Sequence, residues 1–138
     1  MNTYPILITC ENAAYQLAYS ASIGSASVFK GIGNEDKAAP AVICYAESKE
    51  EILTSTYVYA VDLNIIVKER AKTVDSDDIG ALAGKVHNVF LSDTTRQALE
   101  NATPNFAVYD VIEQPSTNTV EDDAFIQPLR LKVICCKK

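Results

Sequence analysis

The chain of 138 residues is poor in the residue types from which most catalytic and metal sites are built. It has one histidine, His87, and four cysteines, none of which stands in a CxxC pair. Their spacing, with the histidine far away in sequence, does not suit zinc, so no metal-binding residue is predicted. A disulfide framework is not expected at this cysteine density. We therefore expect Cys10, Cys44, Cys135 and Cys136 to be small buried apolar residues of a chain made in a reducing cytoplasm.

Basic residues are also scarce. Lysine and arginine number 12 against 18 acidic residues, which gives a formal net charge of −6. A general nucleic-acid-binding protein would carry a basic face, so the composition disfavours that class. Basic residues do gather near the C-terminus, and acidic clusters lie elsewhere. These opposite charges are either solvated surface or complementary contacts between identical copies, and the sequence leaves both open. The basic residues are Arg130, Lys132, Lys137 and Lys138; the acidic ones are Glu47, Glu50, Glu51, Asp75, Asp77, Asp78, Glu121, Asp122 and Asp123.

Long apolar runs and glycine motifs are missing as well. No stretch approaches the ~18–20 apolar residues that cross a bilayer, so no membrane contact is expected. The N-terminus lacks the charged region of a signal peptide, which predicts a soluble protein. The segment Gly31–Gly33 lacks the third glycine of a dinucleotide fingerprint and indicates a turn. No phosphate-binding GxxxxGK[ST] motif occurs, and no cofactor-binding residue is predicted.

The catalytic candidates are weak. His87 lies off the main apolar stripe of an expected helix over 78–91, and no nucleophile motif such as GxSxG is present. The carboxylate pairs 77–78 and 122–123 are adjacent residues, which do not face each other across a cleft. We therefore predict no catalytic residue and no enzymatic activity. A small hydrolase or transferase with its site around His87 stays as a weaker hypothesis.

What the chain does have is a hydrophobic fraction of 48%, sufficient for a real core, and one long alternating segment. Over residues 56–68 one parity is wholly apolar, and the other is mixed. A strand of this length would span roughly 43 Å at ~3.3 Å per residue. Part of it is expected to project and to pair with another copy. The apolar parity consists of Tyr57, Tyr59, Val61, Leu63, Ile65 and Val67.

The remaining segments predict a single α+β domain over 1–138, with a mostly antiparallel sheet and helices packed on one face. The other face is semi-polar and must meet water or a neighbouring subunit. Residues 3–9, within a possible N-terminal arm over 1–10, are apolar. We expect helices over 11–22, 78–91 and 92–101, the last capped by Ser92 or Asp93 with Leu99 inward. The other expected strands are 27–30, 40–47, 106–113 and 125–136; 31–39 is expected to be a loop, 48–53 a polar connector, and 114–124 a flexible hairpin loop.

Two strands carry specific expectations for their faces. In the strand over 106–113, Phe106, Val108 and Ile112 share one parity. In the final strand one parity is apolar, while Arg130 and Lys132 lie on the other. The apolar parity of that strand consists of Leu129, Leu131, Val133 and Cys135.

The order of these segments resembles the tail terminator proteins of long-tailed bacteriophages, also called tail completion or neck proteins. The resemblance covers roughly residues 11–136 and rests on element order, size and texture rather than on an invariant signature. It is carried by a proline-opened strand, a long strand, an acidic lead into a helix, a short helix and two final strands. These segments read PAVICYAES, IIVKER, DDIGALAGKVHNVFLS, TRQALEN, FAVYDVIEQ and LRLKVICC.

The resemblance implies an α+β subunit without enzymatic activity that assembles with itself into a ring, usually a hexamer. Such a ring caps the tail tube protein, faces the head–tail connector or stopper protein, and belongs to the virion tail or neck after synthesis in the host cytoplasm. DNA passes its lumen without specific binding, and the acidic composition agrees with that. Segments 3–9, 31–38 and 114–124 are the expected contact elements, and the resemblance implies that 56–68 is a central strand of the sheet. The alternative is a small non-enzymatic adaptor, another neck or tail component or a host-interaction protein, whose sheet captures a partner strand.

Overall fold

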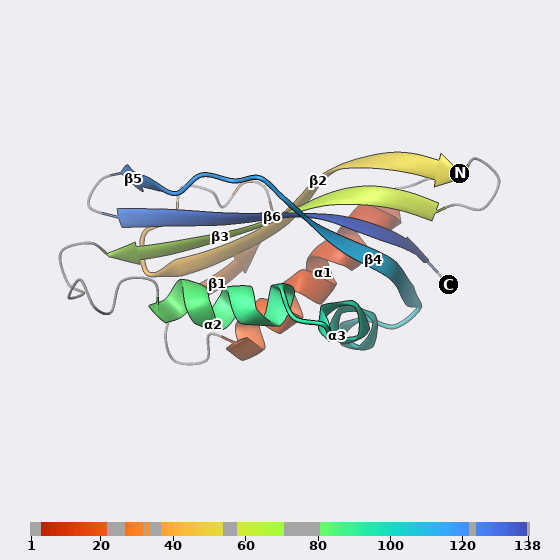
Figure 1. Ribbon diagram of the computed structural model, residues 1–138, viewed down its shortest axis with the longest axis horizontal. Coiled ribbons are helices and arrows are strands. Elements are labelled where there is room, and N and C mark those ends of the chain that lie inside the picture. The colour runs from red at the N-terminus through yellow and green to blue at the C-terminus, as the bar shows by residue number, and fades with distance from the viewer. Residues whose placement is uncertain are drawn as a thin grey trace.

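A six-stranded sheet covered by helices on one face organises the chain (Figure 1). The structure is a computed structural model that describes residues 4–21, 27–31, 33, 37–53, 58–70, 81–121 and 124–137. The described helices are α1 (Tyr4–Ala21), α2 (Ala81–Phe90) and α3 (Thr95–Ala102). The described strands are β1 (Ser27–Lys30), β2 (Ala41–Leu53), β3 (Val58–Arg70), β4 (Phe106–Gln114), β5 (Thr119–Glu121) and β6 (Ala124–Lys137).

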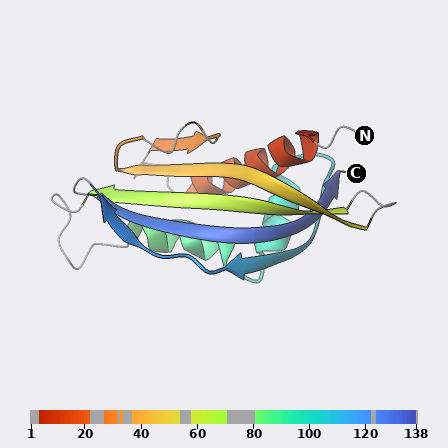
Figure 2. The ribbon, with the colours of Figure 1, turned by 90° about the horizontal axis from the view of Figure 1, so that it is seen from above.

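The strands lie in the order β1-β2-β3-β6-β4, and the short β5 also pairs with β6 (Figure 2). Only the β1–β2 pair is parallel among the described strands, so the predicted mostly antiparallel α+β fold is confirmed. The three described helices lie against one face of the sheet, and the other face carries no described helix (Figure 1).

The core forms where the apolar parities of β3 and β6 meet the helices. Val61, Leu63, Ile65 and Val67 of β3 are fully buried, as their alternation predicts. The predicted inward residues of β6 are also buried: Leu129, Leu131, Val133 and Cys135. Burial of this apolar area supplies the main favourable contribution to folding.

The long strand is central rather than projecting. β3 pairs with β2 from Val58 to Lys68 and with β6 from Tyr59 to Arg70, so almost every residue of β3 has a partner on both sides. The expectation that part of the 56–68 segment pairs with another copy is therefore wrong for the described residues; 56 and 57 lie outside them. A strand hydrogen-bonded on both sides has no ladder positions left for a third strand.

β2 is longer than its sequence suggests. The polar segment 48–53, expected as a connector, continues the strand to Leu53, with ladder irregularities between Ala46 and Ser48 and between Glu51 and Leu53. The prediction fails because the ladder is made by backbone groups, which pair with β3 whatever the side-chain polarity.

The expected N-terminal arm is instead the start of α1. Residues 4–10 are helical, and the buried positions Ile6, Cys10, Ala14 and Ala18 recur at intervals of four along the helix. The stripe that faces the sheet thus begins before Glu11, where we expected the helix to start. Pro5 does not prevent this, because proline is tolerated in the first turn of a helix. Residues 1–3 lie outside the described part of the chain.

The two short helices follow their apolar patterns. Leu82, Ala83, Val86 and Phe90 of α2 are buried, and Leu99 of α3 is fully buried as predicted. Residues 78–80 of the expected first helix lie outside the described residues.

The predicted cap of α3 is wrong. The N-cap position is held by Thr94 without a side-chain cap bond. Thr95 ties the two helices together instead, because its hydroxyl donates to the Val89 carbonyl (2.8 Å) and accepts from the Ser92 N–H (3.1 Å).

Candidate interaction surface

The most distinctive surface lies along the β4 side of the sheet. β4 is the last strand in the sheet order and carries two of the large apolar side chains that stand exposed, Tyr109 at 58% and Ile112 at 41%. Val120 on β5 is 62% exposed, but it lies beside Phe125, on the opposite parity of β6 from Ile112, so it is not part of this surface. Exposed apolar residues that lie close together are a common sign of an interaction site.

A bulge in β4 puts Ile112 on this surface. The register with β6 shifts between Val108 and Asp110, so that Val111 turns inward and packs against the core while Ile112 turns outward. The expected shared face of Phe106, Val108 and Ile112 is correct for the first two residues and wrong for Ile112. An inserted residue reverses the alternation of everything after it, and the letters alone do not show it.

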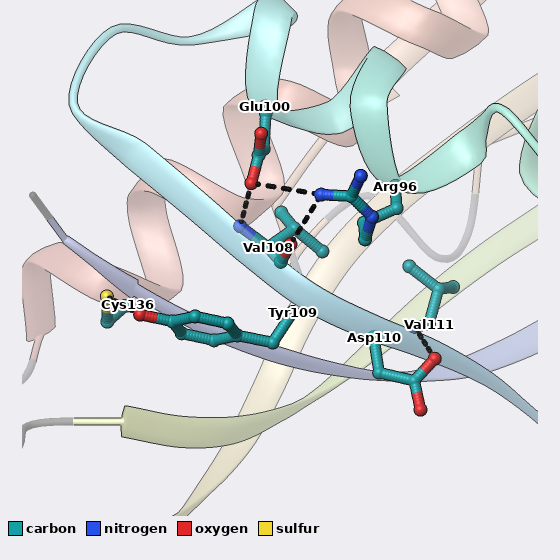
Figure 3. A network of polar contacts seen from close by, with 7 residues as sticks. All are labelled: Arg96, Glu100, Val108, Tyr109, Asp110, Val111 and Cys136. Atoms are coloured by element: carbon teal, nitrogen blue, oxygen red, sulfur yellow. Dashed lines mark hydrogen bonds and ion pairs between the residues drawn. The ribbon is translucent and has the colours of Figure 1, made fainter.

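The outer edge of β4 is closed by side chains (Figure 3). Glu100 of α3 accepts a hydrogen bond from the backbone N–H of Val108 (Oε2 to N, 2.8 Å), and Arg96 donates to the Val108 carbonyl (Nη1 to O, 3.2 Å). Arg96 and Glu100 also form an i, i+4 ion pair at 3.5 Å. These two side chains occupy the positions that another strand would use, so strand addition at Val108 is blocked.

A second position along the same edge is also closed by a side chain. The N–H of Val111 donates to the Asp110 carboxylate (2.9 Å), just beyond the bulge (Figure 3). The edge groups at Val108 and Val111 therefore have partners within their own chain, and a bulged, side-chain-capped edge resists pairing with a second copy.

A groove of about 570 Å³ opens between the α2–α3 connection and β4. Its charged lining consists of Asp93, Asp110, Glu113 and Arg96. Since Arg96 is already paired with Glu100, the groove is acidic. Its other lining residues are Phe90, Leu91, Ser92, Thr95, Tyr109, Val111 and Leu131. We refer to it as the acidic groove.

The helix-free face of β6 has the opposite charge. Arg130 is exposed and Lys132 is half-buried on the parity that points away from the helices, as predicted. Across the ladder from them lie Asn64 and Asp62. The other predicted basic positions, Lys138 and the side chain of Lys137, lie outside the description. So do residues 75, 77, 78, 122 and 123 and the side chains at 50 and 51 of the predicted acidic clusters.

His87 lies on α2, half-buried beside β6. Burial lowers its pKa below the ordinary value, although the nearby backbone of Gln127 and the carboxylates of Glu113 and Glu69 oppose the shift. Its Nε2 is buried and has no hydrogen-bond partner in the described part of the chain. A general base would be hydrogen-bonded to a nucleophile, and no such bond is found at Nε2.

Glu69 joins the sheet to the start of α2. Its carboxylate is 95% shielded from solvent and accepts from the Ala83 N–H (3.1 Å) and from Nε2 of Gln127 (2.9 Å). A carboxylate at a helix N-terminus is favoured by the helix dipole, so this contact reads as structural.

The cysteines behave as small core residues. Cys10, Cys44 and Cys135 are buried, as expected, and Cys136 is half-buried near the Tyr109 hydroxyl (3.5 Å). Contact with Cys135 and burial raise the pKa of Cys10, and burial raises that of Cys44. Such thiols are unreactive. Among the described residues no group of three or more histidine, cysteine or acidic residues is arranged to hold a metal.

The two expected contact loops are only partly described. Gly33, Lys37 and Ala38 are exposed. Residues 115–121 are exposed too, but 119–121 form β5 and pair with β6, so the expected hairpin loop contains a short strand. Within the described helices, none is long and apolar enough to span a membrane.

Sequence reasoning did not find the acidic groove or the closed edge, because their residues come from three separate segments of the chain. The spacing of Arg96 and Glu100 was the one signal that could have suggested an ion pair on α3. A scan against protein-family models and a search of curated proteins found no match to this chain.

Proposed function

We propose that the chain is a structural subunit of a bacteriophage tail or neck, of the tail terminator type, whose copies close into a ring with six as the expected number. The ring caps the tail tube and offers its other side to the head-side connector or stopper. The proposal starts from the resemblance in element order, and its structural support is a sheet whose described helices all lie on one face.

The observation that carries the proposal is the uncovered face along β6 and β4. No described helix lies over this face of β6, and three of its apolar residues remain partly exposed: Ile126, Pro128 and Ile134. The register places Ile112 beside Lys132 and Asp110 beside Ile134, so the exposed residues of β4 continue the same surface. A surface that joins apolar residues on neighbouring strands is suited to a protein contact.

The helix layer and the uncovered sheet face are different surfaces, as a ring requires. Head-to-tail contacts between unlike surfaces close into rings when the rotation between copies permits. The closed β4 edge favours contact between faces of neighbouring copies. It weighs against the addition of a partner strand at this edge, which is a possible contact under both the ring and the adaptor hypothesis. The net charge of −6 suits a lumen through which DNA passes without binding.

The decisive experiment is light scattering on the purified chain, followed by electron microscopy with and without isolated tail tubes. We expect one assembled species near six times the mass of a single chain, ring-shaped particles, and rings at one end of the tubes. A monomer at high concentration that ignores tail tubes and connectors would contradict the proposal and favour the adaptor.

A pair of matched variants locates the contact. Ile112→Glu places a negative charge on the uncovered face and is expected to weaken assembly about tenfold or more, because the carboxylate would be desolvated in the contact. Ile8→Glu, at a residue of similar exposure (45% against 41%) on α1, is the control. Loss of assembly in the Ile8 variant alone would move the contact to the helix layer.

A further inference from the structure

We propose that the acidic groove of one copy binds Arg130 and Lys132 of a second copy, an inference that rests on the proposed ring and specifies its contact. The groove supplies carboxylates at Asp93 and Glu113, and the occupant is the basic pair on the helix-free face of β6. Three observations support this pairing. The carboxylates of Asp93 and Glu113 have no ion-pair partner among the described residues, the same holds for the basic pair, and the two sets lie on opposite faces of the sheet.

The groove carries two carboxylates without ion-pair partners among the described residues. Asp93 and Glu113 are both exposed, and neither forms an ion pair with any residue that the structure describes. The lone cation in the groove lining, Arg96, is held by Glu100 and the Val108 carbonyl. The exposed Leu91 (47%) adds an apolar side chain to the same groove. A guanidinium with an aliphatic stem matches such a mixture of carboxylate and apolar surface.

The side chains of the basic pair have no partner among the described residues of their own copy. Arg130 and Lys132 lie two residues apart on one face of β6, and within the described part of the chain neither side chain forms a hydrogen bond or an ion pair. Lys132 lies across the ladder from Asp62, whereas Arg130 lies across from the neutral Asn64. Arg130 is therefore the less neutralised of the two, and its fork of N–H groups suits a bidentate bond to a carboxylate.

The placement of the two surfaces excludes closure within one copy. Phe90, Val111 and Leu131 line the groove from the side of the sheet that faces the helices, while Arg130 projects from the other side. Since the sheet separates them, the carboxylates of Asp93 and Glu113 can reach an Arg130 only on another chain, whereas Asp110 lies at the rim of the groove, on the same face as Arg130. Contact between two unlike surfaces of identical copies is heterologous, which is the kind of contact that builds rings.

The test uses charge reversal on each side of the contact. The groove variant is Asp93→Lys with Glu113→Lys, and the face variant is Arg130→Glu with Lys132→Gln. Lys132 is changed to a neutral residue because a carboxylate there would oppose Asp62 across the ladder. The control is Glu47→Lys with Gln97→Lys and Asn101→Lys, which makes the same change in net charge as the groove variant at exposed residues outside the groove. Circular dichroism and thermal melting verify that each variant is folded.

We expect each reversed variant alone to raise the dissociation constant for self-association about tenfold or more, since like charges then meet across the contact. The control should assemble as the wild type does. A mixture of the two variants should regain assembly when they alternate. The acidic face of the face variant then fits the basic groove of the groove variant, and the unchanged basic face of the groove variant fits the unchanged acidic groove of the face variant. Rising salt should weaken the wild-type assembly, because exposed charge pairs are screened.

Failure of this inference differs from failure of the proposed function. If both reversed variants form rings as the wild type does, the groove contact is overturned and the proposed ring is not. A groove variant that loses assembly without rescue in the mixture would overturn the assignment of Arg130 as the occupant. Rings with the expected charge behaviour that ignore tail tubes would support the contact and count against the tail function. A monomeric wild type would overturn both.

Discussion

At the scale of single residues, Glu100 is the side chain on which most of the closed edge depends. Its carboxylate accepts from Val108, whose side chain is 1% exposed, and it also holds Arg96 in place. A backbone N–H that loses its partner at a shielded position costs about 1–3 kcal/mol.

We therefore expect Glu100→Ala to lower the free energy of unfolding by about 1–2 kcal/mol and to make the protein more prone to aggregate through β4. Urea denaturation and light scattering over time measure the two effects. Glu100→Gln keeps an acceptor for Val108 and should lose less. Glu113→Ala, at an exposed carboxylate without a backbone bond, is the control; an equal loss there would remove the special role of Glu100.

His87 predicts a pH dependence of stability. Burial lowers its folded-state pKa below the ordinary value of 6.5, so the unfolded chain takes up the proton more readily. Stability is unaffected by this group above about pH 6.5 and decreases as the pH falls below that value, until the folded-state pKa is reached. The backbone of Gln127 and the carboxylates of Glu113 and Glu69 oppose the shift.

The measurement compares the free energy of unfolding of the wild type and of His87→Gln between pH 8 and pH 5. Taking the difference cancels the carboxylates that titrate in both proteins. We expect the wild type to lose more stability than the variant as the pH falls. Parallel curves, or a greater loss in the variant, would show that the pKa of His87 is not lowered in the folded protein.

At the scale of elements, the β4 bulge decides which side chains reach the core. Alternation predicts Ile112 inward, but the extra residue between Val108 and Asp110 turns Val111 inward instead. Nothing in the segment FAVYDVIEQ indicates whether Val111 or Ile112 points inward, because both residues are β-branched and apolar. The register is set by β6, a segment that comes later in the chain.

The corresponding test compares two truncations on β4. Val111→Ala should lower the free energy of unfolding by about 1–2 kcal/mol, because it removes methyl groups that pack against the core. Ile112→Ala should change it by less than about 0.5 kcal/mol, as expected for an exposed residue. Urea denaturation of both variants measures this order, and the reverse order would mean that the strand has no bulge in solution.

Element boundaries show the same division between local and non-local causes. The cores of β3, β6, α2 and α3 were predicted because each has its own clear period. The start of α1 and the end of β2 were not, because both depend on what the segment packs against or pairs with. Ile6 and Cys10 form a buried stripe because the sheet covers them. Residues 48–53 are extended because they pair with β3.

At the scale of the whole molecule, fold class was readable from the order of segments, whereas the candidate surface was not. The acidic groove joins residues 90–96, 109–113 and 131, which only the strand order β3-β6-β4 brings together. The predicted acidic clusters contain none of the groove residues Asp93, Asp110 and Glu113, so charge patterning did not indicate this surface. The proposed contact is therefore a property of the topology more than of any motif.

The same strand order has a consequence for how the chain is made. β6 lies between β3 and β4 but leaves the ribosome after both of them. Until it emerges, the inner edge of β3 and that of β4 lack the strand that will join them, and the helices cover only part of a sheet. Most of the protein is thus synthesised before its middle strand exists, and nascent copies on one message have unpaired strands within reach of one another.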